Sequence, residues 1–159
     1  MTPRPAAGFT LVELVAVLVL TAVLGAAALG RWQGPETRLG YQADQLARDL
    51  RHAQFLAMAW ERPLRFAPVP GGYRVACVTA GPAPCDASPV QDPATGQPFQ
   101  VLLADATLAG PVVDFDTLGR PTAAGGGLLA GSQTWTLSAG AGSAAVTLAP
   151  LTGFATVTY

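Results

Sequence analysis

The sequence predicts an α+β protein in which a long N-terminal helix, with an apolar half and an amphipathic half, packs on a small antiparallel β-sheet domain. Three observations carry this prediction. An apolar run extends from Phe9 to Leu29, and a second helical pattern follows it as far as Trp60. The rest of the 159 residues forms short runs that alternate polar and apolar side chains between glycines and prolines. Alternation at a period of two is typical of half-buried strands, whereas steps of three and four are typical of one helix face.

The apolar run is long for a helix of a small protein. Between Phe9 and Leu29 the only ionisable side chain is that of Glu13. At about 1.5 Å of rise per residue, a helix over this run is roughly 30 Å long, enough to cross a bilayer core. A carboxylate near the start of such a helix is costly without a partner, so Glu13 is a candidate functional residue. The leader, residues 1–8, ends in a small residue before the apolar run, whereas a secretory signal peptide is cleaved after its apolar region.

Residues 8–14 read Gly-Phe-Thr-Leu-Val-Glu-Leu, which resembles the N-terminus of type IV pilins and pseudopilins. The resemblance implies cleavage between Gly8 and Phe9 by a membrane prepilin peptidase and methylation of the new Phe9 amine. It also implies a pilin-like fold and assembly with other pilin or pseudopilin subunits through the N-terminal helix. In that family the glutamate that stands here as Glu13 pairs with the terminal amine of a neighbouring subunit. The alternative is a plain signal anchor in which this glutamate is incidental.

These features divide the chain into four segments. Residues 1–8 are the expected leader peptide, 9–30 the transmembrane and polymerisation helix, 31–62 its amphipathic continuation and 63–159 the β domain. Gly34-Pro35 should kink or interrupt the helix, because proline removes a backbone donor. The expected location is the bacterial inner membrane, spanned once, with the C-terminal domain in the periplasm and the assembled protein in a periplasmic filament.

The second helical half carries one apolar stripe, whose members recur at steps of four and three: Leu39, Ala43, Leu46, Leu50, Ala53, Ala57 and Trp60. Charged residues, Asp49 among them, fall elsewhere on the expected helix surface. His52 is the only histidine. Because no partner can be nominated for it from the sequence, we interpret it as a surface or packing residue and not as a catalyst or metal ligand.

Beyond Pro63 we expect strands over 64–67, 73–79, 99–103, 112–115, 133–138, 144–148 and 154–159, with loops over 81–98 and 122–132. Alternation predicts that the last three strands turn one set of side chains toward the helix stripe: Trp135, Leu137, Val146, Leu148, Val157 and Tyr159.

One turn between these strands has a signature of its own. Residues 115–121 resemble the Phe-Asp-x-x-Gly-Arg-Pro turn in the globular domain of the GspH/FimT family of minor pseudopilins, and the matching residues are Phe115, Asp116, Gly119, Arg120 and Pro121. Glycine can supply the strained position of the turn. These residues need no catalytic role, because Phe115 can anchor the turn in the core and Arg120 can pair with Asp116 or Asp114.

Cys77 and Cys85 are the two cysteines of the chain. An oxidising compartment outside the inner membrane permits a disulfide between them, and the glycine and prolines in the intervening loop suit such a closure. The alternative is two reduced, separately buried thiols. Two cysteines at this spacing, without further ligands, do not make a zinc pattern, and the loop aspartates lack calcium-ligand spacing. We therefore expect neither a metal nor another cofactor.

Charge and composition weigh against other classes of protein. The net charge is −1, and beyond Arg74 only Arg120 faces five aspartates. A nucleic-acid partner is therefore not expected, since DNA contacts rely on Lys and Arg. No catalytic constellation emerges, so we expect no enzyme. The leading hypothesis is a minor pilin or pseudopilin of a type II secretion pseudopilus or a type IV pilus, two machines whose subunits share all of these features. The alternative is a FimT-like minor pilin that binds DNA during DNA uptake.

Overall fold

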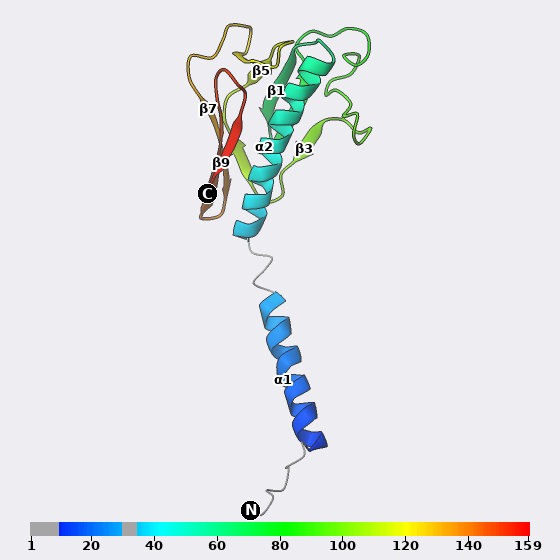
Figure 1. The fold of residues 1–159 in the computed structure, drawn as a ribbon, viewed down its shortest axis with the longest axis vertical. Helices are drawn as coiled ribbons and strands as arrows, with labels where there is room; N and C mark the ends of the chain where they lie inside the picture. The colour runs from blue at the N-terminus through cyan, green and yellow to red at the C-terminus, as the bar shows by residue number, and fades with distance from the viewer. Residues whose placement is uncertain (1–9, 30–34) are drawn as a thin grey trace, which may run out of the picture. The chain divides into compact units, whose positions relative to one another are not determined.

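The computed structural model describes residues 10–29 and 35–159, and the chain divides between Gly34 and Pro35 into two compact units (Figure 1). The first unit contains helix α1, Leu11–Leu29. The second contains helix α2, Pro35–Ala59, packed on antiparallel strands. The expected α+β class is confirmed. Continuity of the helix across residues 30–34 lies outside the described residues.

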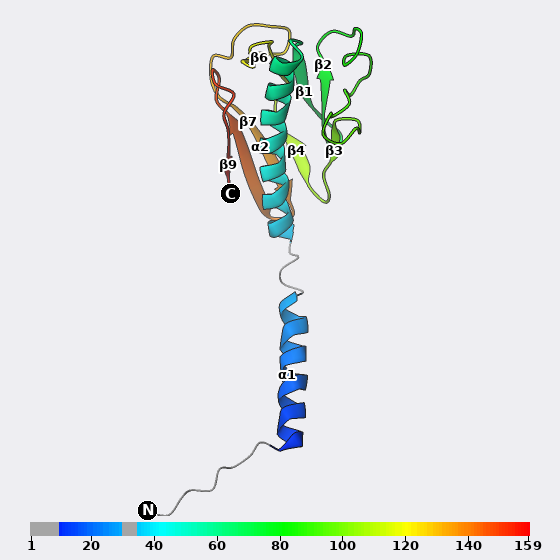
Figure 2. The ribbon, with the colours of Figure 1, turned by 45° about the vertical axis from the view of Figure 1, so that its right-hand side comes forward.

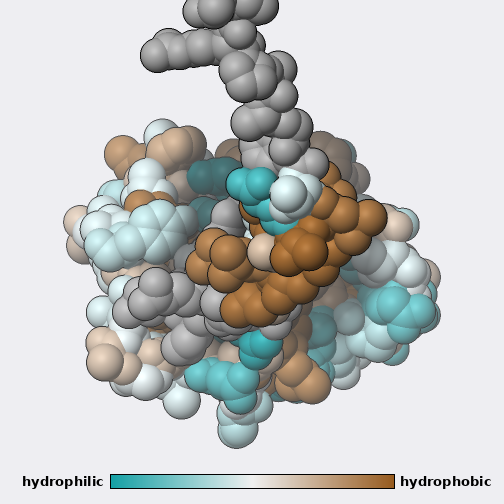
Figure 3. Space-filling view, turned by 90° about the horizontal axis from the view of Figure 1, so that it is seen from below, coloured by the Kyte–Doolittle hydropathy of each residue, from teal (hydrophilic) through white to brown (hydrophobic). Residues whose placement is uncertain are grey.

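Helix α1 is apolar around its circumference. Leu11, Val12 and Leu24 are 80%, 76% and 68% exposed, and every other side chain described on this helix is exposed as well. Figure 3 looks along α1 from its N-terminal end, where brown, hydrophobic residues gather. Within residues 10–29 and 35–159, no helix has the length and apolar character needed to cross a membrane. The single-pass topology stays a prediction.

Helix α2 begins at Pro35. Proline suits this position, because the N–H groups of the first turn have no acceptor within the helix and the lack of one costs no hydrogen bond. The predicted stripe from Leu39 to Ala57 is buried, and Trp60 packs against the core from a half-buried position. The helix ends in a Schellman motif, in which the Arg62 N–H donates to the Ala57 carbonyl at 3.2 Å. The left-handed residue of this motif is Glu61, with φ of 51°.

The strands form two sheets, and every pairing in them is antiparallel. The first sheet has the order β3-β2-β1-β5-β6, with β1 Leu64–Val69, β2 Gly72–Cys77, β3 Gln100–Leu102, β5 Val113–Phe115 and β6 Pro121–Ala123. The second has the order β4-β7-β8-β9, with β4 Thr107–Ala109, β7 Gln133–Ala139, β8 Gly142–Leu148 and β9 Ala155–Thr158. Helix α2 contacts strands of both sheets and runs in front of them in Figure 2.

The sequence misses β4 and β6. Each is three residues long, and β6 lies largely within the stretch 122–132 that was expected to be a loop. Strands this short show too little alternation to be recognised. They are strands because β7 and β5 offer them a backbone edge to pair with.

The inward alternation of the second sheet is confirmed in its central strands. Trp135, Leu137, Val146 and Leu148 are fully buried, and the Trp135 ring meets Phe66 edge-on with centroids 5.4 Å apart. Val157 is half-buried. The prediction for Tyr159 is wrong, because this side chain is 73% exposed and its ring lies beside Gly40 of α2. It follows the end of the edge strand β9, and its ring lies against the surface of α2 at the rim of the core instead of being buried in it.

Candidate functional site

The N-terminus of α1 is built by a capping interaction inside the candidate motif. The N–H of Glu13 donates to Thr10 Oγ1 at 3.3 Å, and the N–H of Leu14 donates to the Thr10 carbonyl at 3.2 Å. Threonine followed three residues later by glutamate is the sequence of a capping box, in which the hydroxyl satisfies one of the free N–H groups of the first turn. Thr10 is thus the helix cap, a role that the sequence analysis overlooked.

This cap fixes where Glu13 lies. Its carboxylate belongs to the first turn of α1, where the partial positive charge of the helix end favours an anion, and its side chain is exposed. Among residues 10–29 and 35–159 no salt bridge uses this carboxylate, and its position suits pairing with an ammonium group. The predicted cleavage residues Gly8 and Phe9 lie outside the described residues.

Comparison with known families agrees with this geometry. Residues 3–29 match the prokaryotic N-terminal methylation motif. The match indicates a type IV pilin-like or pseudopilin N-terminus in general, one that is processed by prepilin peptidase and assembles with other subunits of this kind. It does not reach the second unit, and it does not distinguish a GspH/FimT subtype. Comparisons with curated proteins and with solved structures gave no match.

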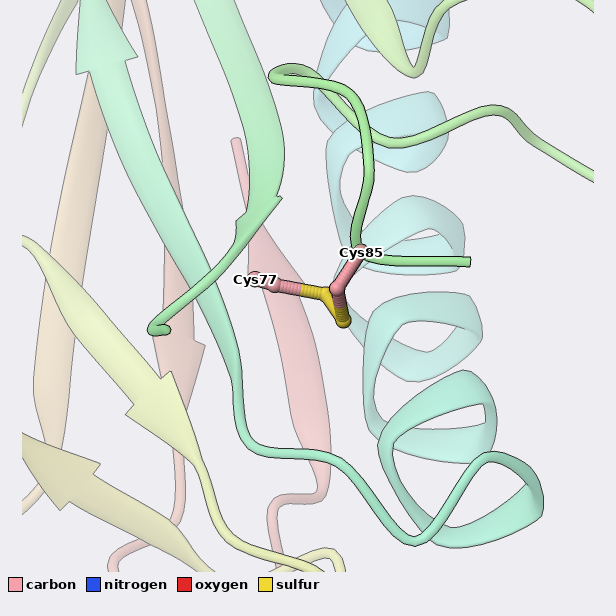
Figure 4. Close-up of a disulfide and its surroundings, with 2 residues drawn as sticks. All are labelled: Cys77 and Cys85. Carbon is pink, nitrogen blue, oxygen red and sulfur yellow. A yellow bond between two sulfur atoms is a disulfide. The ribbon is translucent and has the colours of Figure 1, made fainter. Parts of the chain in front are cut away.

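In the second unit, Cys77 and Cys85 form a disulfide with their Cα atoms 5.5 Å apart (Figure 4). Cys77 ends β2, and Cys85 is a buried residue of the loop that follows. The N–H of Gly81 donates to the Cys85 carbonyl, and the N–H of Cys85 donates to the Pro82 carbonyl, both at 3.0 Å. The disulfide therefore ties a loop that also has its own backbone hydrogen bonds.

The turn between β5 and β6 is organised by one carboxylate. Asp116 Oδ1 accepts the N–H groups of Leu118 at 2.9 Å and Arg120 at 2.8 Å, while its Oδ2 accepts Arg120 Nε at 2.8 Å. Partial burial raises the pKa of Asp116, but the hydrogen bonds from Arg120 and Leu118 outweigh this and hold the pKa below its usual value. Gly119 has φ of 75°, and Phe115 is fully buried beneath the turn.

Of the two carboxylates considered for Arg120, Asp116 is the partner. Asp114 instead accepts both Nε and Nη2 of Arg65, at 2.7 and 2.8 Å, and is only 4% exposed. Pro121 starts β6 opposite Phe115. Among the described residues, both charged side chains of the turn take part in holding it together.

Gln54 on α2 fixes this turn to the helix. Its Nε2 donates to the Gly119 carbonyl and to the Thr152 carbonyl, each at 2.8 Å. This role of Gln54 could not be predicted from the sequence, because Gln54 lies beside the stripe and its two acceptors are far along the chain. The result is that the β5–β6 turn and the β8–β9 turn meet on one side of α2.

Two polar pairs lie on the other side of α2, and the first of them differs from expectation. Asp49 is half-buried, not a surface residue, and its Oδ2 accepts the Tyr73 hydroxyl at 2.6 Å. Burial raises the pKa of Asp49 despite this hydrogen bond, and burial with the nearby carboxylate raises the pKa of Tyr73. His52 Nε2 lies 3.1 Å from Asp92 Oδ1, so the histidine joins the helix to the loop after β2.

These pairs border a shallow pocket of about 320 Å³ that includes Asp49, Asp92 and Phe99. A second pocket, of about 460 Å³, lies beside the β5–β6 turn and is lined by Asp116, Arg120 and Gly125 among others. Among the described residues, no group of three or more His, Cys, Asp or Glu side chains could hold a metal ion. The acids in both pockets already accept hydrogen bonds from neighbouring protein groups.

Proposed function

We propose that this chain is a minor pilin or pseudopilin of the GspH/FimT type, a structural subunit and not an enzyme. Prepilin peptidase cleaves it between Gly8 and Phe9, and the Phe9 amine is then methylated. The segment 9–29 anchors it in the bacterial inner membrane with the β domain in the periplasm. It then assembles through this helix into a type II secretion pseudopilus or a type IV pilus.

The observation that carries the proposal is the capped start of α1 inside the matched motif. Thr10 accepts the N–H of Glu13 and thereby sets the carboxylate on the first turn, close in sequence to the amine that cleavage at Phe9 creates. A helix with apolar side chains all around is suited to lipid before assembly and to neighbouring helices afterwards. Removing a lone carboxylate from water is costly, so a cationic partner in the next subunit favours the assembled state.

Two features of the second unit support the finer assignment. The turn 115–121 keeps the Phe-Asp-x-x-Gly-Arg-Pro pattern, and Asp116 and Arg120 use their charges to hold it. The Cys77–Cys85 disulfide suits a domain in an oxidising compartment, where such bonds persist.

The test is incorporation into filaments. Glu13→Ala and Glu13→Val should insert into the inner membrane as the parent does but enter sheared or purified filaments much less. Val17→Ala is the matched control, because it changes an exposed α1 side chain without touching the charge. Normal incorporation of both Glu13 variants contradicts the proposed assembly role. Mass spectrometry of the mature chain should show loss of the first eight residues and one added methyl group on Phe9, and an intact leader contradicts the processing step.

A further inference from the structure

Five large apolar side chains gather beside α2 without being buried. They come from α2, from the β5–β6 turn and from the β8–β9 connection, and we call them the α2 patch: Phe55, 59% exposed; Met58, 42%; Leu118, 66%; Leu151, 66%; and Phe154, 59%. Single exposed apolar residues are ordinary, but a contiguous group on a small domain marks a contact site.

The contacts between these segments make the patch contiguous. Gln54 on α2 bonds the carbonyls of Gly119 and Thr152, which are next to Leu118 and Leu151 in the chain. Gly119 packs closely against Met58, with no room for a Cβ between them. The Arg51 guanidinium lies over the Phe154 ring, 5.3 Å from its centroid.

The patch is also held in place. Asp116 fixes the turn that carries Leu118, through two backbone N–H groups and Arg120 Nε. In the β8–β9 connection, the Ala149 N–H donates to the Phe154 carbonyl at 3.0 Å. A partner that binds such a preformed surface loses little free energy to ordering it.

Arginines edge the patch. The Arg51 guanidinium lies over Phe154, and its Nη2 donates to the Ala155 carbonyl. Arg48 stands about one helical turn before Arg51, with its guanidinium over the Tyr41 ring, 5.7 Å from the centroid, and both arginines are exposed. Arg120 is half-exposed, and among the residues that the structure describes it bonds the Asp116 carboxylate through its Nε alone of the guanidinium nitrogens. Phe, Met and Arg are enriched in the centres of protein interfaces, and arginine beside an aromatic ring is typical of residues that dominate binding energy.

This charge pattern selects the partner. A two-fold contact with a second copy would bring Arg48 and Arg51 against the same arginines of that copy, which is repulsive. The outer face of the β4-β7-β8-β9 sheet is no better as a partner, because its exposed residues are uncharged and small, among them Thr134, Thr136 and Ser138. A surface that complements the patch must combine large apolar groups with carboxylates.

We propose that the α2 patch docks a different subunit of the same filament, through an apolar surface edged by Asp or Glu side chains. This inference rests on the proposed function and adds a contact made by the second unit to the contact made by α1. Two subunits that are joined through α1 and also through the α2 patch are held more strongly than by one of these contacts alone. The reason is that the second contact then forms within a pair that is already joined.

The test is site-specific photo-crosslinking of the full chain in cells that assemble the filament. A photoreactive amino acid replaces Phe55 in one variant and Leu151 in another, and the matched control carries it at Thr136, which is exposed on the opposite face of the second sheet. We expect both patch positions to give an adduct at least several-fold more abundant than the control position gives. Mass spectrometry of the adduct should identify another chain with the N-terminal methylation motif, joined at an apolar segment beside carboxylates.

Charge reversal tests the arginines. The double variant Arg48→Glu, Arg51→Glu should reduce the Phe55 adduct several-fold, whereas Arg48→Lys, Arg51→Lys should retain most of it. An adduct only with a second copy, equal yields at Phe55 and Thr136, no adduct, or insensitivity to charge reversal each overturns the proposal. An intact Cys77–Cys85 disulfide and cooperative thermal unfolding show that the variants fold. Because Arg51 also donates to the Ala155 carbonyl, the melting temperature of the charge-reversed variant is expected to fall.

The outcome separates the two proposals. If the chain enters filaments and Glu13 is required for entry, but Phe55 gives no adduct, the docking inference fails and the proposed function stands. If the Glu13 variants assemble normally and the leader is intact, the proposed function fails whatever the patch binds.

Discussion

Asp116 Oδ2 accepts Arg120 Nε at 2.8 Å while Asp116 Oδ1 accepts the N–H of the same arginine, so one carboxylate binds both the side chain and the backbone of Arg120. The ion pair and the turn are thus one structure. Because the side chain of Asp116 is 23% exposed, its hydrogen bonds are partly protected from water. This relationship makes the turn dependent on the ionised form of the carboxyl group.

We expect the turn to weaken in acid. The pKa of Asp116 is held below the ordinary value of 3.8, so its contribution to stability is fully present above that pH and is lost as the pH falls through the lowered pKa. Asp116→Asn keeps an acceptor for the backbone but loses the charge, and should lower the free energy of unfolding at neutral pH by roughly 1–2 kcal/mol. Urea unfolding from pH 2 to pH 7 measures both effects. Asp86→Asn, at an exposed loop position, should change neither; a parallel loss in that control would refute the assignment.

We expect Asp49 to make the opposite contribution to the pH dependence of stability. Burial raises its pKa above 3.8, so the contribution of the protonated form is fully present below 3.8 and is lost as the pH rises through the raised pKa. Asp49→Asn keeps an acceptor for the Tyr73 hydroxyl and removes the half-buried charge. The Asp49→Asn variant should therefore be at least as stable as the parent at pH 7. Its free energy of unfolding should vary less with pH between pH 4 and pH 7.

Tyr73→Phe is the companion variant for the Asp49 pair. It removes the hydroxyl that donates to Asp49 at 2.6 Å and should cost about 1–2 kcal/mol at pH 7, because the carboxylate then lacks that donor. Urea unfolding of this variant beside the parent and Asp49→Asn measures the loss. A Tyr73→Phe protein as stable as the parent at neutral pH would mean that water replaces the hydroxyl without loss.

The elements that the sequence predicts correctly are those in which burial imposes a period. Leu39 to Ala57 follow the helical repeat and Trp135 to Leu137 the strand repeat, because one face of each element meets the core. Glu13 is equally readable, since it is the only ionisable side chain between Phe9 and Leu29, whereas the capping role of Thr10 was not predicted. The turn at Asp116 is readable because its residues are neighbours in the chain.

What could not be predicted depends on residues brought together by the fold. Asp49 looks like a surface residue until β2 places Tyr73 beside it. Gln54 has no recognisable role until two turns, more than sixty residues further on, present their carbonyls to it. The α2 patch combines three separate segments, so no local pattern in the sequence announces it.

Substitution of Gly119 tests how closely the β5–β6 turn packs against α2. It has φ of 75°, and a Cβ built on it would lie 2.7 Å from Met58 Sδ. Gly119→Ala should therefore lose about 1–2 kcal/mol to backbone strain and at most about 1 kcal/mol more to the contact, because Met58 is flexible and 42% exposed and can shift. Gly125→Ala is the matched control, because its φ is 96° but nothing lies within 4 Å of the added Cβ. It should show only the strain.

A double-mutant cycle then isolates the contact between Gly119 and Met58. Adding Met58→Ala should recover the clash component of Gly119→Ala and leave the strain component. Chemical denaturation of the four proteins measures the coupling. If the two substitutions simply add, Met58 moves aside from the new methyl group without a measurable cost.

Glu61 is the position where a substitution should stabilise the protein. It is the left-handed residue of the motif that ends α2, with φ of 51°, and its N–H donates to the Met58 carbonyl at 3.3 Å. Glycine adopts this conformation without the steric cost that other residues bear, so Glu61→Gly should raise the free energy of unfolding by about 1 kcal/mol. Glu61→Ala removes the same charge but keeps the strained backbone, and should leave stability close to that of the parent. Thermal unfolding of the three proteins decides the matter: if glycine and alanine raise the melting temperature equally, the gain comes from the lost carboxylate and not from the backbone.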